Sequence, residues 1–192
     1  MTRRRFHIRN IRGIVRAKDG ISAVEFALIA PLMLLMYAGC IELSLMMQLD
    51  RKVTTSTATL GDLTARATLI TNDDLDDIFE ATRMIFQPND IKAARMRVSS
   101  LREDDGDIVV DWSDACNLPA YNPEETISVP NNLVPENGSV IFAEIEYDYT
   151  SKVGGLFTNK QTLKDKFYLR PRRVDLVARQ EDKPFTCQHK AP

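Results

Sequence analysis

A carboxylate, Glu25, stands near the start of a long apolar run, within the stretch KDGISAVEFALIAP of residues 18–31. An ionised side chain at bilayer depth costs roughly 2.5 to 3.5 kcal/mol or more, so it is tolerated best with a charged partner. A cut after Gly20 would supply one, because Ile21 would gain an α-amino group with a reference pKa of about 7.7 to 8.0. Glu25, fifth residue of the mature helix, could then meet the amine of a neighbouring subunit in a filament. Alternatively, Glu25 lies at the membrane interface and reaches water without a partner.

The three cysteines carry the other reactive groups of the sequence. Cys40 lies in the apolar run, whereas Cys116 and Cys187 fall in the part that we expect to be exported. An oxidising compartment would let these two form a disulfide. The bond would close a loop of roughly 70 residues, for which the chain-entropy model gives about 4 kcal/mol as an upper value.

The sequence contains few of the residues that catalysis or metal binding usually requires. Its two histidines are His7 in the leader and His189 in the tail, so a histidine-based triad or a multi-histidine metal site is not expected. Gly-rich phosphate loops are missing from the sequence, and the acidic residues near 73–77 lack the EF-hand spacing for calcium. We therefore expect neither an enzyme nor a bound cofactor.

The charge distribution predicts a membrane orientation. Residues 1–20 hold seven basic residues and one acidic residue, a net charge of +6, and since the whole chain carries −2 the remainder carries −8. The 29 residues from Ile21 to Leu49 are largely apolar, and about 20 suffice to span a bilayer. We expect a cytoplasmic leader (1–20), one transmembrane helix (21–49) and an exported domain (50–192). Nucleic-acid binding is not expected, because no recognition motif follows the basic leader.

Three processing routes compete for this segment. Ordinary signal peptidase needs a small-x-small site just after the apolar core, and ARA at 65–67 comes too late. YAGC at 37–40 partly resembles a lipoprotein box, which would place a lipid on Cys40, but Tyr37 fits such a box poorly. The third route is cleavage on the cytoplasmic side after Gly20, which leaves the apolar run as the mature N-terminus.

Beyond residue 49 the pattern first predicts helices. An apolar stripe continues the membrane helix outward as a stem that faces either its own domain or a neighbouring subunit. The stripe consists of Val53, Leu60, Leu63, Ala67 and Ile70. Residues 72–88 predict a second helix, capped by Asn72 or Asp73 and ended by Pro88.

The later segments predict antiparallel strands. REDDG, between RMRVSSL and DIVVDW, indicates a hairpin near residues 95–112. Alternation over 141–150 predicts a strand with one buried face. Its acidic face would lie opposite Lys164, Lys166 and Arg170 in a hairpin through 152–161. Prolines between 116 and 138 predict an extended loop, and the tail after Val177 is expected to be loosely held.

Residues 20–43, read as G-ISAVEFALIAPLMLLMYAGCIEL, resemble the N-terminus of the TadE/TadG-like pilus assembly family. The shared features are a basic leader, a glycine before the cut, and a glutamate followed by an aromatic residue, here Glu25 and Phe26. AEIEYDYT at 143–150 and FYLRPRR at 167–173 are also similar to that family. Ile21 departs from the pattern, because members often carry a small residue there.

Helices followed by antiparallel strands predict an α+β fold with a long N-terminal helix, a second helix and a small antiparallel β domain. The resemblance implies that this fold is pilin-like and that the chain is a minor pseudopilin of a tight-adherence pilus or secretion apparatus, acting by subunit assembly. The implied partners are a prepilin peptidase that cuts between Gly20 and Ile21, other pilin or pseudopilin subunits, an inner-membrane assembly platform and membrane lipid. The protein would cross the bacterial inner membrane once, with its C-terminal domain in the periplasm or outside the cell. The alternative is a bitopic or lipid-anchored binding or adhesion module that never enters a filament.

Overall fold

The computed structural model describes residues 20–130, 133–135, 138–151, 160–180 and 185–187. The chain divides into two units, Met1–Leu43 and Ser44–Pro192. The leader before Gly20, the turn expected at 152–159 and His189 lie outside the described residues. Helices are followed by an antiparallel sheet, so the predicted α+β fold is confirmed.

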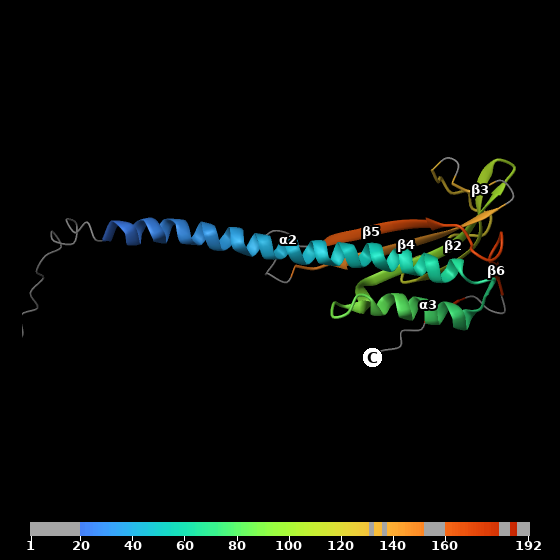
Figure 1. The fold of residues 1–192 in the computed structure, drawn as a ribbon, viewed down its shortest axis with the longest axis horizontal. Helices are drawn as coiled ribbons and strands as arrows, with labels where there is room; N and C mark the ends of the chain where they lie inside the picture. The colour runs from blue at the N-terminus through green and yellow to red at the C-terminus, as the bar shows by residue number, and fades with distance from the viewer. Residues whose placement is uncertain (1–19, 131–132, 136–137, 152–159, 181–184, 188–192) are drawn as a thin grey trace, which may run out of the picture. The chain divides into compact units, whose positions relative to one another are not determined.

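A long helix, α2, runs from Ile21 to Ala65 (Figure 1). Leucine, methionine and alanine dominate residues 27–36, and these residue types have high helix propensity. Pro31 lies inside the helix without ending it. The helix continues past residue 49, which confirms the predicted stem.

The second half of α2 contributes to the core of the unit Ser44–Pro192. Leu49, Val53 and Leu60 are each at most 3% exposed and belong to one apolar cluster with the sheet. The stripe therefore faces its own domain. Its predicted extension through Ala67 and Ile70 is wrong, because the helix ends at Ala65 and Ile70 lies in the short strand β1 (Leu69–Ile70).

The second helix, α3, spans Asn72–Met84. The predicted cap, Asn72 or Asp73, is wrong, because Thr71 occupies the cap position. The Thr71 hydroxyl accepts from the Asp74 N–H, and the Asp74 carboxylate accepts from the Thr71 N–H, which satisfies two of the donors that a helix start leaves open. Phe79 brings α3 into the same core as α2.

Four strands form the main sheet in the order β3-β2-β4-β5, with every neighbouring pair antiparallel. They are β2 (Ala94–Asp104), β3 (Asp107–Cys116), β4 (Ser139–Tyr149) and β5 (Gln161–Leu169), and the short 3-10 turn η2 (Ile91–Ala93) leads into β2. The predicted β2–β3 hairpin is confirmed. Its turn uses Asp105 and Gly106 at φ 50° and 92°, as tight hairpin turns require.

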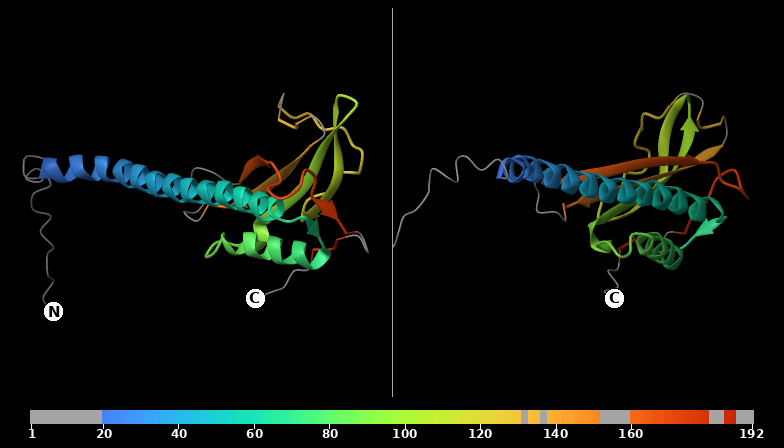
Figure 2. Two further views of the ribbon diagram at one scale, coloured as in Figure 1. Left: turned by 45° about the vertical axis from the view of Figure 1, so that its right-hand side comes forward. Right: turned by 60° about the vertical axis from the view of Figure 1, so that its left-hand side comes forward.

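The strand β4 is buried on both faces, so the prediction of one buried face is wrong. On one face Ile141, Ala143 and Ile145 belong to the same apolar cluster as residues of α2 and α3, and Figure 2 shows the helices lying along the sheet. On the other, Phe142 is 1% exposed in a second cluster with Leu101 and Val110. The loop after β3 covers this second cluster through Tyr121, Ile127 and Val129.

Part of the C-terminal tail is held firmly, so the prediction of a loose tail after Val177 is wrong for residues 178–180. The strand β6 (Ala178–Arg179) pairs in parallel with β1. Trp112 Nε1 donates to the Val177 carbonyl at 2.8 Å, and Arg179 Nε donates to Asp114 Oδ2 at 2.8 Å.

Candidate functional site

Gly20 and Ile21, the residues expected to flank a cleavage site, lie at the start of α2. Gly20 forms a turn directly before the helix, and a Cβ built on it would meet no atom within 4 Å. Ile21 is 53% exposed. The described structure therefore does not require a glycine at position 20. A requirement for glycine there would come from another molecule that binds this bond.

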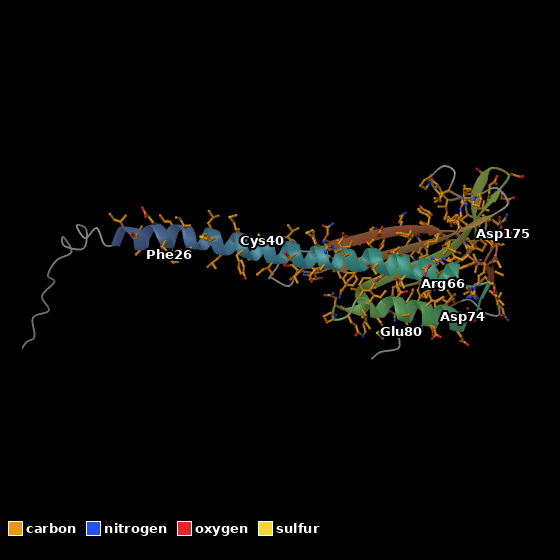
Figure 3. All side chains as sticks on the ribbon, viewed as in Figure 1. Phe26, Cys40, Arg66, Asp74, Glu80 and Asp175 are labelled. Carbon is orange, nitrogen blue, oxygen red and sulfur yellow. A yellow bond between two sulfur atoms is a disulfide. The ribbon has the colours of Figure 1, made fainter. Side chains whose placement is uncertain are left out.

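Glu25 and Phe26 lie in the second turn of α2 and are exposed, Phe26 by 70%. Figure 3 shows the Phe26 side chain directed away from the helix axis. Glu25 makes no hydrogen bond or ion pair with any residue that the structure describes. Residues four apart share a helix face and are separated by about 6 Å along the axis. Glu25 therefore lies on the same face of α2 as Ile21, about one turn further along the helix.

The helix surface between Ile21 and Leu43 is mostly apolar and exposed. Large side chains exposed by half or more are Ile21, Val24, Phe26, Leu28, Ile29, Leu32, Met33, Leu34, Leu35, Met36, Tyr37 and Leu43. By length and composition α2 can cross a membrane, and it is the one such helix among the described residues. This is consistent with a single-pass membrane protein. Cys40, a free cysteine, is exposed on the same segment.

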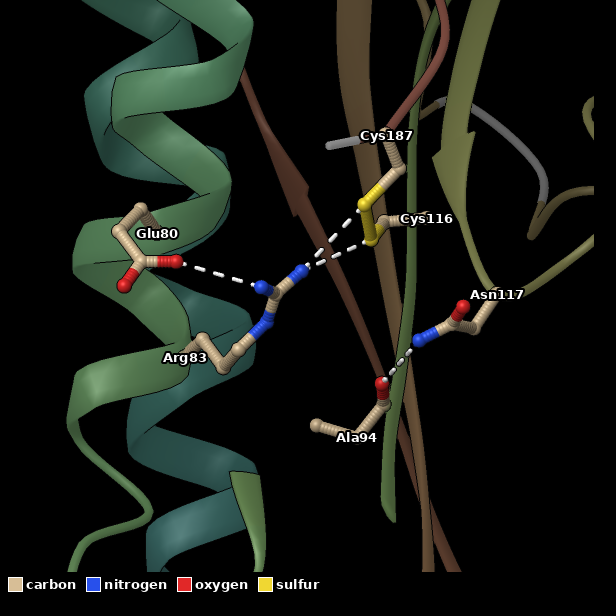
Figure 4. Close-up of a disulfide and its surroundings, with 6 residues drawn as sticks. All are labelled: Glu80, Arg83, Ala94, Cys116, Asn117 and Cys187. Atoms are coloured by element: carbon tan, nitrogen blue, oxygen red, sulfur yellow. Dashed lines mark hydrogen bonds and ion pairs between the residues drawn. A yellow bond between two sulfur atoms is a disulfide. The ribbon is translucent and has the colours of Figure 1, made fainter. Parts of the chain in front are cut away.

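The two other cysteines, Cys116 and Cys187, are joined by a disulfide, with their Cα atoms 5.2 Å apart. Arg83 of α3 points at the bond (Figure 4). Its Nη2 donates to Cys116 Sγ at 2.9 Å and to Cys187 Sγ at 3.3 Å, and its Nη1 donates to Glu80 Oε2 at 3.2 Å. Arg83 is 3% exposed. Because sulfur accepts hydrogen bonds weakly, Glu80 provides the main charge partner of this buried guanidinium.

Two rows of charged residues, called the charge rows below, cross three strands on the sheet face opposite the helices. In each row an arginine of β2, a glutamate of β4 and a lysine of β5 lie side by side in register. The rows are Arg97, Glu144 and Lys166, and Arg95, Glu146 and Lys164. The predicted pairing of the acidic β4 face with Lys164 and Lys166 is thereby confirmed, whereas Arg170 lies just beyond β5.

The contacts within the charge rows are short. Glu144 Oε2 lies 2.5 Å from Arg97 Nη2, and Glu144 Oε1 lies 3.1 Å from Lys166 Nζ. Glu146 likewise contacts Arg95 Nη2 at 3.0 Å and Lys164 Nζ at 2.6 Å. Each glutamate therefore lies between two cations. The sequence did not predict the role of the two arginines, because β2 and β4 are not consecutive strands and their pairing has no local signal in the sequence.

Tyr121, from the loop after β3, joins the first charge row. Its hydroxyl accepts from Arg97 Nη2 at 2.6 Å and donates to Glu144 Oε2 at 3.0 Å, and the guanidinium carbon lies 3.6 Å from its ring centroid. Burial, and then the Glu144 charge, raises the pKa of Tyr121 to about 12. This contact attaches the loop to the sheet.

No metal site is assembled by the part of the chain that the structure describes. It contains no group of three His, Cys, Asp or Glu residues placed to hold a metal ion. A cavity of about 380 Å³ lies between Leu49, the turn after α3 and the end of β4. Its acidic side chains are already used, because Asp90 accepts from the Lys92 N–H and Asp148 accepts from Thr162 Oγ1.

Comparison with known proteins relates the N-terminal segment to one family. The family model described as TadE-like protein matches residues 20–59. The match begins at Gly20 and includes Glu25, Phe26 and the whole apolar segment, so the predicted resemblance is confirmed over these residues. No curated protein and no solved structure matches the chain.

Proposed function

We propose that this chain is a minor pseudopilin that acts by subunit assembly in a tight-adherence pilus or secretion apparatus. One observation carries the proposal. Gly20 and Glu25 fall in the segment matched by the TadE-like model, yet the described fold requires neither of them, because a Cβ built on Gly20 would meet no atom within 4 Å and Glu25 has no described partner. Residues that a chain does not need for its own fold are available for recognition by another molecule.

The proposed mechanism is electrostatic. Cleavage after Gly20 creates an α-amino group at Ile21, which is largely protonated near neutral pH. In an apolar environment this amine and the Glu25 carboxylate of an adjoining subunit stabilise one another, because their attraction is strong at low dielectric and offsets part of the desolvation of both charges. The exposed apolar side chains around Glu25 would pack against lipid before assembly and against other subunits afterwards.

The partners follow from these steps. A prepilin peptidase would cut the leader, other pilin or pseudopilin subunits would receive the helix, and an inner-membrane platform would drive assembly. The leader would stay in the cytoplasm and the C-terminal domain would lie in the periplasm or outside the cell. The protein would act through these contacts and not as an enzyme.

Mass spectrometry of the protein purified from its native membrane tests the proposal. The expected mature N-terminus is Ile21. An intact leader, or a chain that begins at a lipidated Cys40, would overturn the proposal and favour an anchored binding or adhesion module. A Gly20→Ala variant provides a second readout, because its new Cβ has open space. It should fold and insert normally but accumulate with its leader attached.

A further inference from the structure

The main sheet has two edge strands, β3 and β5, which differ in whether described residues pair with their outer side. The edge of β3 is covered by its own loop, because Val110 N donates to Glu125 O at 3.0 Å and Ile127 N donates to Ile108 O at 2.9 Å. The strand β5 pairs with β4 on one side. No other described residue forms a backbone hydrogen bond with its outer side. An uncovered edge presents donors and acceptors that can pair with another chain.

The direction of the β5 backbone groups that do not pair with β4 follows from one contact. The Lys166 N–H donates to the side chain of its neighbour Asp165, at 2.8 Å from Oδ1, instead of to β4. Since successive N–H groups alternate in direction along a strand, the Lys164 N–H also points outward. At least two amides of β5 thus face away from the sheet.

The charge rows end at this same edge. From β2 to β5 each row reads positive, negative, positive, so its last member is a lysine on the edge strand β5. The Lys164 and Lys166 side chains are 60% and 59% exposed even though each contacts a glutamate. The next member that would continue the alternation is a carboxylate.

We propose that the outer edge of β5 binds an extended segment of another protein that carries Glu or Asp at alternate positions. The partner segment would add a fifth strand to the sheet. Its backbone would pair with the outward amides of Lys164 and Lys166, at Lys166 in place of the Asp165 carboxylate, and its acidic side chains would extend the charge rows. Cross-strand pairs of opposite charge stabilise such a pairing, whereas like charges directly opposite destabilise it.

A second copy of β5 fits this edge poorly. If two β5 strands pair antiparallel with their apolar faces on the same side, residues of the same face lie opposite one another. Centring the pair on Asp165 then places Lys164 opposite Lys166 in both halves, and centring it on either lysine places that lysine opposite its own copy. The partner is therefore a different, acidic strand. This inference does not depend on the proposed role in pilus assembly.

Peptide binding to the full-length protein in detergent micelles tests the inference. The probes are a synthetic peptide of about ten residues that alternates Glu with Val or Thr, and a matched peptide with Lys in place of Glu. The acidic peptide should bind at least about tenfold more tightly than the basic one. By NMR, the Lys164 and Lys166 amides should become protected from solvent exchange when it binds.

Charge variants provide the matched controls. The double variant Lys164→Gln with Lys166→Gln should bind the acidic peptide about tenfold or more weakly than wild type does. The double variant Lys164→Glu with Lys166→Glu should bind the basic peptide more tightly than the acidic one. Lys92→Gln removes an exposed lysine away from the edge and should leave binding unchanged. Equal binding of both peptides, no binding, or binding without protection of the two amides would each overturn the proposal. Retained Trp112 fluorescence shows that each variant is folded.

Discussion

Thr71 and Asp74 exchange hydrogen bonds at the start of α3. The Thr71 hydroxyl accepts from the Asp74 N–H at 3.2 Å, and Asp74 Oδ2 accepts from the Thr71 N–H at 2.9 Å. The side-chain and backbone hydrogen bonds from Thr71 hold the pKa of the Asp74 carboxyl below its ordinary value of 3.8. A carboxyl group with a lowered folded-state pKa stabilises the fold fully when the pH is above the ordinary pKa of the group. This contribution is lost as the pH falls through the folded-state pKa.

Replacing Thr71 by alanine tests this capping box. We expect Thr71→Ala to lower the free energy of unfolding by about 1 kcal/mol near neutral pH. The difference from wild type should narrow in acid, once the pH has fallen through the lowered folded-state pKa of Asp74, because both proteins then carry a protonated Asp74 and only the hydroxyl contact distinguishes them. Urea unfolding followed by the fluorescence of Trp112 measures it at both pH values. A difference that stays constant with pH would contradict the coupling.

At the other end of α3, Lys52 of α2 donates from Nζ to the Gln87 carbonyl at 2.6 Å. A cation near the C-terminal end of a helix is stabilising, and here it also satisfies a free carbonyl. Lys52→Ala should therefore reduce stability by about 1 kcal/mol in the same urea assay. The neighbouring Arg51→Ala is the control, since Arg51 is exposed and makes no described contact. Equal effects of the two variants would refute the role of Lys52.

The disulfide should contribute more than either of these contacts. Replacing Cys116 and Cys187 by serine frees a segment whose ends are 71 residues apart in sequence, and the chain-entropy model gives about 4 kcal/mol as an upper value for such a loop. The same change replaces both sulfur acceptors of the buried Arg83 guanidinium by serine hydroxyls, which can still accept hydrogen bonds, so the expected loss comes from the covalent bond itself. Cys40→Ser is the matched control and should leave the urea midpoint unchanged. A comparable loss in that control would show that the effect is not specific to the bond.

The sequence predicts those elements of the fold that have a regular pattern. The acidic face of β4 and the lysines of β5 have the same two-residue spacing, so their register could be predicted from complementary charge. Thr71 was missed because Thr71, Asn72 and Asp73 are all good capping residues, and only the strand β1 just before them decides which one caps.

Other features depend on contacts between residues far apart in sequence. The strands β1 and β6 have two residues each, too few for a periodicity to detect. The second buried face of β4 is covered by a loop rich in proline and polar residues, whose composition alone predicts exposure. Arg83 lies 33 residues from Cys116 in sequence, and its place in the helix gives no sign of that contact.

Tyr121 should make stability depend on alkaline pH. Its folded-state pKa is raised to about 12 from an ordinary 10.0, so the folded protein keeps the neutral phenol after the unfolded chain has begun to ionise. The stabilisation is complete below about pH 10 and is lost as pH rises toward 12. Because the ring is only half-buried, we expect a loss on the order of 1 kcal/mol. Tyr121→Phe should have a lower free energy of unfolding than wild type near neutral pH, but this free energy should fall less as the pH is raised. Unfolding curves at several alkaline pH values measure both. If the assignment is wrong, the free energy of unfolding will depend on pH equally in the two proteins.

Glu25 should be required for assembly and dispensable for insertion. Its exposed position in α2, without a described partner, means that Glu25→Gln removes the charge without disturbing a contact in the fold. Loss of a carboxylate lowers the cost of membrane burial, so insertion and cleavage should proceed as in wild type while incorporation into filaments is abolished. Glu25→Asp keeps the charge on a shorter side chain and should retain part of the assembly. Comparing membrane fractions, mature N-termini and sheared filaments for the three proteins separates these steps. Normal filaments from Glu25→Gln would show that the proposed ion pair with the Ile21 amine does not drive assembly.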